Sequence, residues 1–323
     1  MNWRARRQTV HVAIAVTLLL VFVFYLRAGS ETLEYANRRQ HAAIAKPALK
    51  LGDRDVEMVV ATMKKENITW LDDYLTDWNK NIYVVDDPHA ELTVPVNKGR
   101  EAMVFLTYII DRYDSLPGNV IFHHAERFQW HNDNPDYDAL PLLQRFRIDA
   151  LKEEGYINLR CVWVLGCPAE IKPKLDQSPP VEGEPVHAKH VYKAAYEELF
   201  PDLDVPDVIG VTCCSQFAVR RETIRRRPRE DYVRYRDWLM TTKLGDDLSG
   251  RVLEYSWHVV FGKESVHCPN AGDCYCRTYG MCDMKCEKDK CANQYTLPKF
   301  ATLPKGWPQI GWDNEVREWS GPP

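Results

Sequence analysis

Between residues 56 and 200 the sequence alternates between short apolar segments and amphipathic segments. Strand-like runs occur at 56–63, 81–87, 118–125 and 156–166, and segments with helical periodicity follow them at 69–78, 99–116, 138–155 and 187–200. This alternation predicts an α/β fold with an open, mainly parallel, twisted sheet and flanking helices, in a Rossmann-like arrangement. We expect this domain to extend over residues 55–264.

A cluster of six cysteines follows the α/β pattern: Cys268, Cys274, Cys276, Cys282, Cys286 and Cys291. Their density favours a disulfide-stapled module at residues 265–294. Zinc is the alternative, but the spacing lacks the paired C-x-x-C knuckles of structural zinc sites. The remaining residues, 295–323, carry several Pro and Trp residues and are expected to form an extended tail.

Three arginines near the N-terminus precede an apolar run at residues 10–26. Such a run makes about 25 Å of helix, enough for a bilayer when the flanking side chains reach its surface. Because positive charge stays on the cytosolic side, we expect a cytosolic tail at 1–9, a transmembrane signal-anchor at 10–26 and a stem at 27–54. A cleaved signal peptide is the alternative.

This topology predicts a single-pass type II membrane protein of the Golgi or endoplasmic reticulum, with the folded domain in the lumen. A lumenal domain can form disulfides, and its sequon at Asn67 can be glycosylated. The net charge of −4 gives no reason to expect a nucleic-acid partner.

The segment 97–105 begins a predicted helix with two cations, Lys98 and Arg100. Cations at a helix N-terminus forgo a stabilisation of about 0.3 to 1 kcal/mol each, so we expect an anion between them and the free N–H groups. Asn97 is a cap-like residue, and Gly99 lets the backbone approach a ligand. The predicted diphosphate site comprises Asn97, Lys98, Gly99 and Arg100. Ahead of it Asp86 and Asp87 follow a strand, where they would contact the nucleoside.

Histidines and carboxylates are concentrated in the segment that follows the third predicted strand. Their nitrogen and oxygen atoms suit a divalent cation, Mn²⁺ or Mg²⁺, or would replace its charge. The candidate ligands are His124, Glu126, His131 and Asp133. The alternative is a core histidine at His123 followed by ordinary loop residues.

The segment "SGRVLEYSWHVVFG" places Arg251, Glu254 and His258 on one face if it is a single helix. A carboxylate flanked by Arg and His can act as a positioned base, so Glu254 and His258 are the candidate catalytic residues. A surface ion-pair ladder is the alternative.

Two further features come from the segment between residues 213 and 229. A disulfide between adjacent cysteines requires an unfavourable backbone geometry, so we expect either Cys213 or Cys214 to form a disulfide with Cys161 or Cys167 instead. Six arginines follow, and in a lumen they would form a solvated helix end or bind an anionic sugar acceptor. They are Arg220, Arg221, Arg225, Arg226, Arg227 and Arg229.

The segments "TWLDDYL", "NKGREAMVFLTYIIDRYDSLPGNVIFHH", "WHND", "CCSQFAV", "SGRVLEYSWHVVFG" and "CPNAGDCYCRTYG" resemble a fungal family known as domain of unknown function 3431. The resemblance covers residues 57 to about 286, and family members are described as glycosyltransferase-like. A second resemblance is to GT-A glycosyltransferases, in which a helix-start motif precedes a strand that ends in the metal-binding D-x-D. Asn97, Gly99 and Ala102 take the corresponding helix positions, and His124-Ala125-Glu126 stands where D-x-D is expected.

These resemblances imply a GT-A-like, membrane-anchored lumenal glycosyltransferase of the hexosyltransferase type. It would take a nucleotide sugar as donor and a glycan, a protein or a small molecule as acceptor, with Glu254 deprotonating the acceptor hydroxyl. Two alternatives from other classes stay open. One is a non-catalytic carbohydrate-binding or assembly protein that retains the fold, and the other is a metal-dependent hydrolase built on the histidine cluster.

Overall fold

The computed structural model describes residues 55–176, 180 and 183–322. The described residues up to Val316 belong to one compact unit, and residues 317–322 belong to a second unit without regular secondary structure. The predicted cytosolic tail, transmembrane segment and stem lie outside the described residues. Within the part that the structure describes, no helix combines the length and the apolar composition that a membrane span requires.

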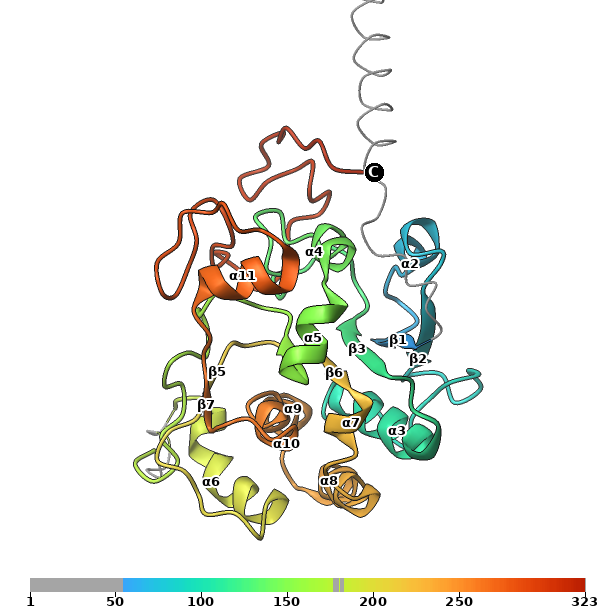
Figure 1. Ribbon diagram of the computed structural model, residues 1–323, viewed down its shortest axis with the longest axis vertical. Helices are drawn as coiled ribbons and strands as arrows, with labels where there is room; N and C mark the ends of the chain where they lie inside the picture. The colour runs from blue at the N-terminus through green and yellow to red at the C-terminus, as the bar shows by residue number, and fades with distance from the viewer. Residues whose placement is uncertain (1–54, 177–179, 181–182, 323) are drawn as a thin grey trace, which may run out of the picture. The chain divides into compact units, whose positions relative to one another are not determined.

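A five-stranded sheet with the order β2-β1-β3-β6-β4 forms the centre of the first unit (Figure 1). The strands are β1 (Val56–Thr62), β2 (Asn79–Val84), β3 (Asn119–His124), β4 (Tyr156–Asn158) and β6 (Phe217–Arg220). β1 pairs in parallel with β2 and β3, whereas β6 is antiparallel to both of its neighbours. One strand is therefore reversed in a mostly parallel sheet. β5 (Gly210–Val211) and β7 (Val266–His267) form a separate parallel pair.

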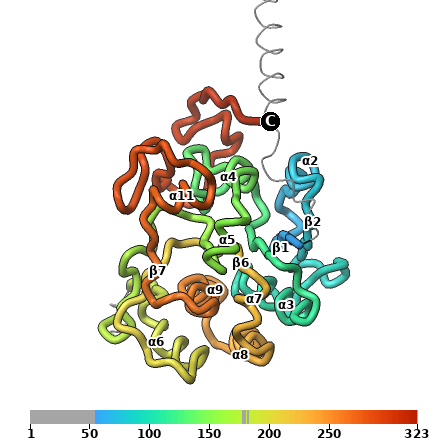
Figure 2. The backbone as a smooth tube through the Cα atoms, in the orientation of Figure 1, coloured from blue at the N-terminus to red at the C-terminus, as the bar shows by residue number. Residues whose placement is uncertain are grey.

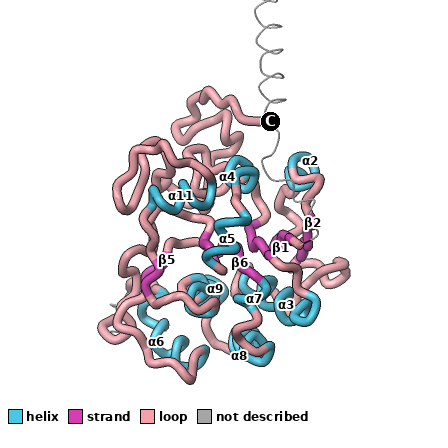
Figure 3. Tube along the Cα trace, in the orientation of Figure 1, coloured by secondary structure: helices cyan, strands magenta, loops and turns pink. Residues whose placement is uncertain are grey.

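Helices cover both faces of the sheet, as Figures 2 and 3 show. One face packs against α2 (Thr69–Tyr74), α4 (Leu140–Arg145), α5 (Ile148–Glu154) and α11 (Ala271–Tyr279). The other face packs against α3 (Ala102–Arg112), α6 (Ala188–Leu199), α7 (Arg221–Ile224), α8 (Arg229–Thr241), α9 (Asp246–Glu254) and α10 (Trp257–Val260). A 3-10 turn, η1 (Tyr113–Ser115), follows α3. The predicted mixed α/β class with flanking helices is confirmed.

Alternation along the strands explains the two cores. In β1, Met58 and Val60 enter the core beneath α2, α4, α5 and α11, whereas Val59 enters the opposite core. In β6, Phe217 enters the same core as Val59, where its ring lies 5.2 Å from that of Trp257. Each such buried side chain contributes about 1.5 to 3 kcal/mol by leaving water.

Three predicted elements differ from the structure. The helix expected at 138–155 is two helices, α4 and α5, with a change of direction at Phe146 and Arg147. The strand expected at 156–166 pairs only over Tyr156–Asn158, because its sole sheet partner, β6, is itself short. The helix expected from Gly250 onward ends at Glu254, and α10 begins afresh at Trp257.

All ten cysteines are paired: Cys161–Cys274, Cys167–Cys268, Cys213–Cys214, Cys276–Cys282 and Cys286–Cys291. The prediction that Cys213 and Cys214 would not bond with each other is wrong. Cys161 and Cys167 instead pair with members of the late cluster. The Cys-rich segment is therefore disulfide-bonded, as expected, but it is also covalently tied to the α/β domain.

The arginine run stabilises the ends of helices. Arg225 donates to the carbonyl group of Tyr113 in η1, and Arg229 donates to that of Ile110 at the end of α3. Arg227 donates to the Val260 carbonyl group at the end of α10. Cations placed there complement the negative end of each helix dipole. Arg225, Arg226 and Arg229 are also exposed, which agrees with the expected solvated helix end, and the anionic sugar acceptor stays a prediction.

The loop before α3 is held by α8 and α9. Gly99 has a φ of +70°, and a Cβ there would overlap the buried side chain of Leu239 in α8. The Lys98 ammonium group donates to the Thr242 carbonyl oxygen, which follows the last residue of α8. Lys98 therefore complements the dipole of α8, which explains a cation ahead of α3 without any ligand.

We predict that Gly99→Ala destabilises the protein by about 2 to 4 kcal/mol, since it adds a positive-φ penalty to overpacking against Leu239. Gly262→Ala is the matched control, because Gly262 has a φ of +77° but nothing within 4 Å of the added Cβ. Urea unfolding of the two variants measures the difference. Equal losses of stability would contradict the packing role of Gly99.

Candidate active site

The candidate site lies at the carboxyl edge of the parallel strands, where ligands bind in open α/β sheets. The strand order reverses between β1 and β3, and β3 ends at His124 on this edge. Because β6 runs in the opposite direction, the loop that precedes it, Cys213–Gln216, reaches the same edge. The start of α3, which follows β2, also comes to this edge.

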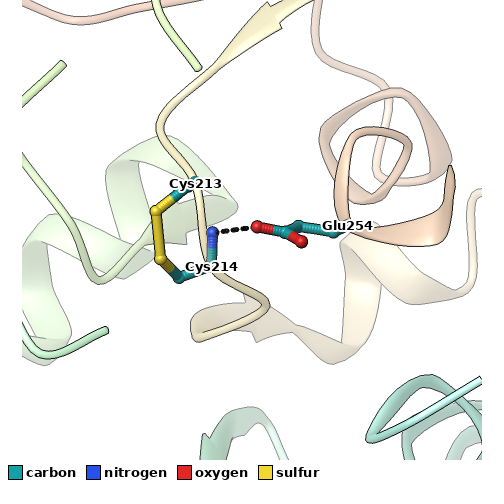
Figure 4. Close-up of side chains that lie close together, drawn as sticks. All are labelled: Cys213, Cys214 and Glu254. Carbon is teal, nitrogen blue, oxygen red and sulfur yellow. Dashed lines mark hydrogen bonds between the residues drawn. A yellow bond between two sulfur atoms is a disulfide. The ribbon is translucent and has the colours of Figure 1, made fainter. Parts of the chain in front are cut away.

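Glu254 is the last residue of α9, and its carboxylate faces the loop before β6 (Figure 4). Its Oε1 accepts the backbone N–H of Cys214 at 2.7 Å. Arg251, one turn earlier, has its Nε 3.9 Å from Glu254 Oε2. Burial raises the pKa of Glu254, and the negative charge of Glu101 adds to this, against the lowering effects of the Cys214 N–H, Arg251 and His124.

Glu101, next to the start of α3, is the second carboxylate of the site. Its Oε2 lies 3.9 Å from Nε2 of His124, and both side chains are about 15% exposed or less. Burial acts to raise the pKa of Glu101, but the imidazole of His124 and the hydroxyl of Ser215 outweigh it, and the pKa is lowered. Two neighbouring carboxylates whose pKa values move in opposite directions are the arrangement of an acid–base site.

Positive charge surrounds the same rim. His131 is half-buried, and its pKa is held well below the ordinary value, first by loss of hydration and then by the charges of His124, Arg160, Arg100 and Arg251. Arg100 is exposed, and the Arg251 side chain is 54% exposed. Cationic side chains that face solvent beside half-buried carboxylates favour an anionic ligand.

Gln216 joins the strand end to the loop that carries His131. Its amide oxygen accepts the His124 N–H at 3.3 Å, and its amide nitrogen donates to Asn132 at 3.1 Å. A buried Arg127–Asp138 pair, with contacts of 3.0 and 2.9 Å, closes the same loop. The rim is therefore preorganised by hydrogen bonds inside the protein.

The structure does not bring the four candidate metal ligands together. The rings of His124 and His131 lie 4.7 Å apart, but Glu126 is exposed. Asp133 is buried, and its carboxylate accepts the N–H groups of Cys161 and Val162 and the hydroxyl of Tyr275. Those donors occupy Asp133, so its role is to hold the loop.

The donor-binding candidates also separate. Asp86 accepts the backbone N–H of Lys64 at 2.9 Å, and Asp87 pairs with the Lys64 ammonium group at 3.0 Å, so both stabilise the turn after β1. Asn97 is exposed, and the Lys98 ammonium group is at the end of α8. Of the predicted diphosphate-binding cations, Arg100 remains at the rim.

His258 does not join Glu254, because the helix breaks between them. It is fully buried in α10, its Nε2 lies 3.0 Å from the Ser265 carbonyl oxygen, and burial lowers its pKa to about 4. Its role is structural. Asn67, in the loop between β1 and α2, is exposed, and its Oδ1 accepts both the N–H and the hydroxyl of Thr69, which leaves the sequon on the surface.

Among the described residues, the side chains of Cys213, Cys214 and Glu254 place three metal-type ligand atoms within 4.8 Å of one another. The two sulfur atoms are bonded to each other, so this is a disulfide beside a carboxylate and not a thiolate metal site. A cavity of about 80 Å³ lies nearby. It is lined by Arg160 and Thr212 but by neither Glu101 nor Glu254.

Sequence reasoning missed three contributors: Glu101, Ser215 and the Cys214 N–H. Glu101 directly follows Arg100, and nothing in the sequence distinguishes it from an ordinary charged residue at a helix start. Ser215 and Cys214 carried no spacing signal, because their place depends on the reversal of β6. Position after a strand is a usable signal only once the strand's direction is known.

We predict opposite pH effects for the two carboxylates. The pKa of Glu101 is lower in the folded protein than in the unfolded chain, so its ionised carboxylate stabilises the fold at neutral pH and this stabilisation is lost as the pH falls through the folded pKa. Glu101→Gln should therefore destabilise the protein at neutral pH but not in acid. Ionised Glu254 is unfavourable at neutral pH, so Glu254→Gln should stabilise there by on the order of 1 kcal/mol and have no such effect in acid. Urea unfolding at both pH values measures this, and parallel effects of the two variants would contradict it.

Comparison with known proteins gives one family. The family described as Protein of unknown function (DUF3431) matches residues 58–277, which is more than half of the chain. Searches among curated proteins and among solved structures gave no match. The matched region includes every residue of the rim, from Arg100 to Glu254. The chain therefore belongs to the DUF3431 family of proteins of unknown function.

Proposed function

We propose that this protein is a glycosyltransferase that uses a nucleotide sugar as donor. The observation that carries the proposal is Glu254, a carboxylate whose pKa is raised by burial and by the charge of Glu101, and which lies beside Arg251 at the edge where α/β sheets bind ligands. A base with a raised pKa is suited to proton transfer near neutral pH. The GT-A-like relationship expected from the sequence is part of this proposal.

In the proposed reaction, Glu254 takes the proton of an acceptor hydroxyl while that oxygen attacks the anomeric carbon of the donor sugar. The bond between the anomeric carbon and the diphosphate breaks, and the electron pair leaves with the diphosphate. Arg100 and Arg251, the exposed cations of the rim, stabilise the departing charge. Glu101, with its lowered pKa, stays ionised beside His124.

A divalent cation would fit at Glu101 and His124. His124 Nε2 is buried without a hydrogen-bond partner and faces a carboxylate, and Mn²⁺ accepts both types of ligand. One or two protein ligands plus donor phosphates are the usual way in which Mg²⁺ is held at such sites. The cation would supply electrostatic stabilisation of the diphosphate. This pair replaces the four-residue set expected from the sequence.

The proposed location is the lumen of the Golgi or endoplasmic reticulum, with the chain anchored as a type II membrane protein. Support comes from the pairing of all ten cysteines in five disulfides, which form and persist in oxidising compartments. The exposed sequon at Asn67 agrees with this.

We predict that a nucleoside diphosphate raises the thermal stability of the protein. At 100 times its dissociation constant the gain is about 2.7 kcal/mol, and Arg251→Gln should weaken it by removing a charge that faces the diphosphate. Arg226→Gln is the control, because Arg226 is an exposed arginine of the helix-capping run. Stabilisation by oligosaccharides alone would favour the carbohydrate-binding alternative, and stabilisation by zinc alone would favour a hydrolase.

We predict that Glu254→Gln lowers turnover of the nucleotide sugar by about 100-fold or more, the usual contribution of general-base catalysis. Nucleotide binding should be unchanged, because the Gln side chain still accepts the Cys214 N–H. Turnover with a hydroxyl acceptor is measured alongside calorimetric binding of the diphosphate. Full turnover in the variant would remove Glu254 from the reaction.

A further inference from the structure

The Cys213–Cys214 pair lies directly against the carboxylate of Glu254. Both cysteines are almost completely buried, with exposures of 2% and 3%. Figure 4 shows that the donor to Glu254 is the backbone nitrogen between the two bonded side chains. The contact therefore depends on the direction in which this peptide group points.

The backbone at Cys214 is in a conformation that L-residues rarely adopt. Its φ is +77°, in the region that favours glycine. Holding a residue other than glycine there is unfavourable, and such conformations persist only where the surroundings enforce them. The surroundings of Cys214 must therefore include restraints that fix this peptide.

Those restraints act on three sides of the pair. The Cys213 N–H donates to the Leu165 carbonyl at 2.9 Å, and the Cys214 carbonyl accepts the Gln216 N–H at 2.6 Å. Nη1 of the buried Arg160 donates to Cys214 Sγ at 3.3 Å. The disulfide links the two side chains of this restrained turn, so they cannot rotate independently.

We propose that the Cys213–Cys214 disulfide is a positioning pair for Glu254: it fixes the Cys214 N–H on the carboxylate that the proposed function uses as its base. The groups that face Glu254 are Glu101 beside α3, His124 at the end of β3, and Arg251 and Tyr255 on and after α9. The Cys214 N–H, in addition to these groups, donates to Glu254 Oε1 at 2.7 Å. This inference rests on the proposed function for its catalytic meaning but not for its geometry.

The test compares two replacements of the disulfide that differ in backbone freedom. In C213A/C214A, alanine resists the positive φ, the N–H turns away, and the pKa of Glu254 should rise further. In C213A/C214G, glycine accepts the same φ, so the pKa should return toward the wild-type value. C276A/C282A is the matched control, because it removes another disulfide while leaving Cys214 intact.

The first readout is the ¹³C NMR titration of the Glu254 carboxyl group without substrate, assigned by its absence in Glu254→Gln. Identical titration in the wild type and C213A/C214A would overturn the proposal, as would an equal rise in C276A/C282A. If C213A/C214A does not fold, C213A/C214N replaces it, and the pKa of its Glu254 should lie above the values in the wild type and in C213A/C214G. The absence of this order would also overturn the proposal.

The second readout is turnover. C213A/C214A should lower kcat by about tenfold with KM for the donor unchanged, and C213A/C214G should recover most of the loss. A kcat in C213A/C214A equal to that of an active wild type would overturn the positioning role. If the wild type shows no transferase activity, the proposed function fails, whereas the NMR order among the variants still decides whether the disulfide positions Glu254.

Discussion

The single hydrogen bond from the Cys214 N–H to Glu254 is the contact on which the chemistry of the rim depends. A buried carboxylate with few donors favours its neutral form, and one with several favours the ionised form. Glu254 has one short donor, whereas Glu101 is stabilised by His124 and Ser215. The difference in donors therefore distinguishes two carboxylates at one edge of the sheet: Glu101 stays ionised, and Glu254 is a proton acceptor with a raised pKa.

The direction of β6 makes this arrangement possible. Because β6 is antiparallel to β3, the residues before it reach the edge where β3 ends. The same loop then serves two neighbours, since Cys214 contacts Glu254 and Gln216 contacts His124. From the other side, Gly250 of α9 packs closely on the carbonyl of Gly99, which fixes the start of α3 beside the helix that carries Glu254. Small residues at this crossing keep both carboxylates on one rim.

Local patterns in the sequence predicted the elements that fold on local signals. The strands at Val56–Thr62 and Asn119–His124 and the helices at Ala102–Arg112 and Ala188–Leu199 agree with the periodicity that predicted them. Such local patterns could not predict contacts between segments that are distant in the sequence. Lys98 was predicted to bind an anion because its actual partner, the Thr242 carbonyl, follows a helix that is far along the chain. His258 appeared to share a face with Glu254 because periodicity does not reveal a break between α9 and α10.

The most direct test of the central claim is a crystal structure of the protein with a bound nucleoside diphosphate. The proposed function predicts that the diphosphate lies at the carboxyl edge of β3, within contact distance of Arg100 and Arg251, and that Glu254 faces the open side where an acceptor would enter. A diphosphate bound away from this edge, or Arg100 and Arg251 pointing into bulk solvent with the ligand present, would contradict the claim.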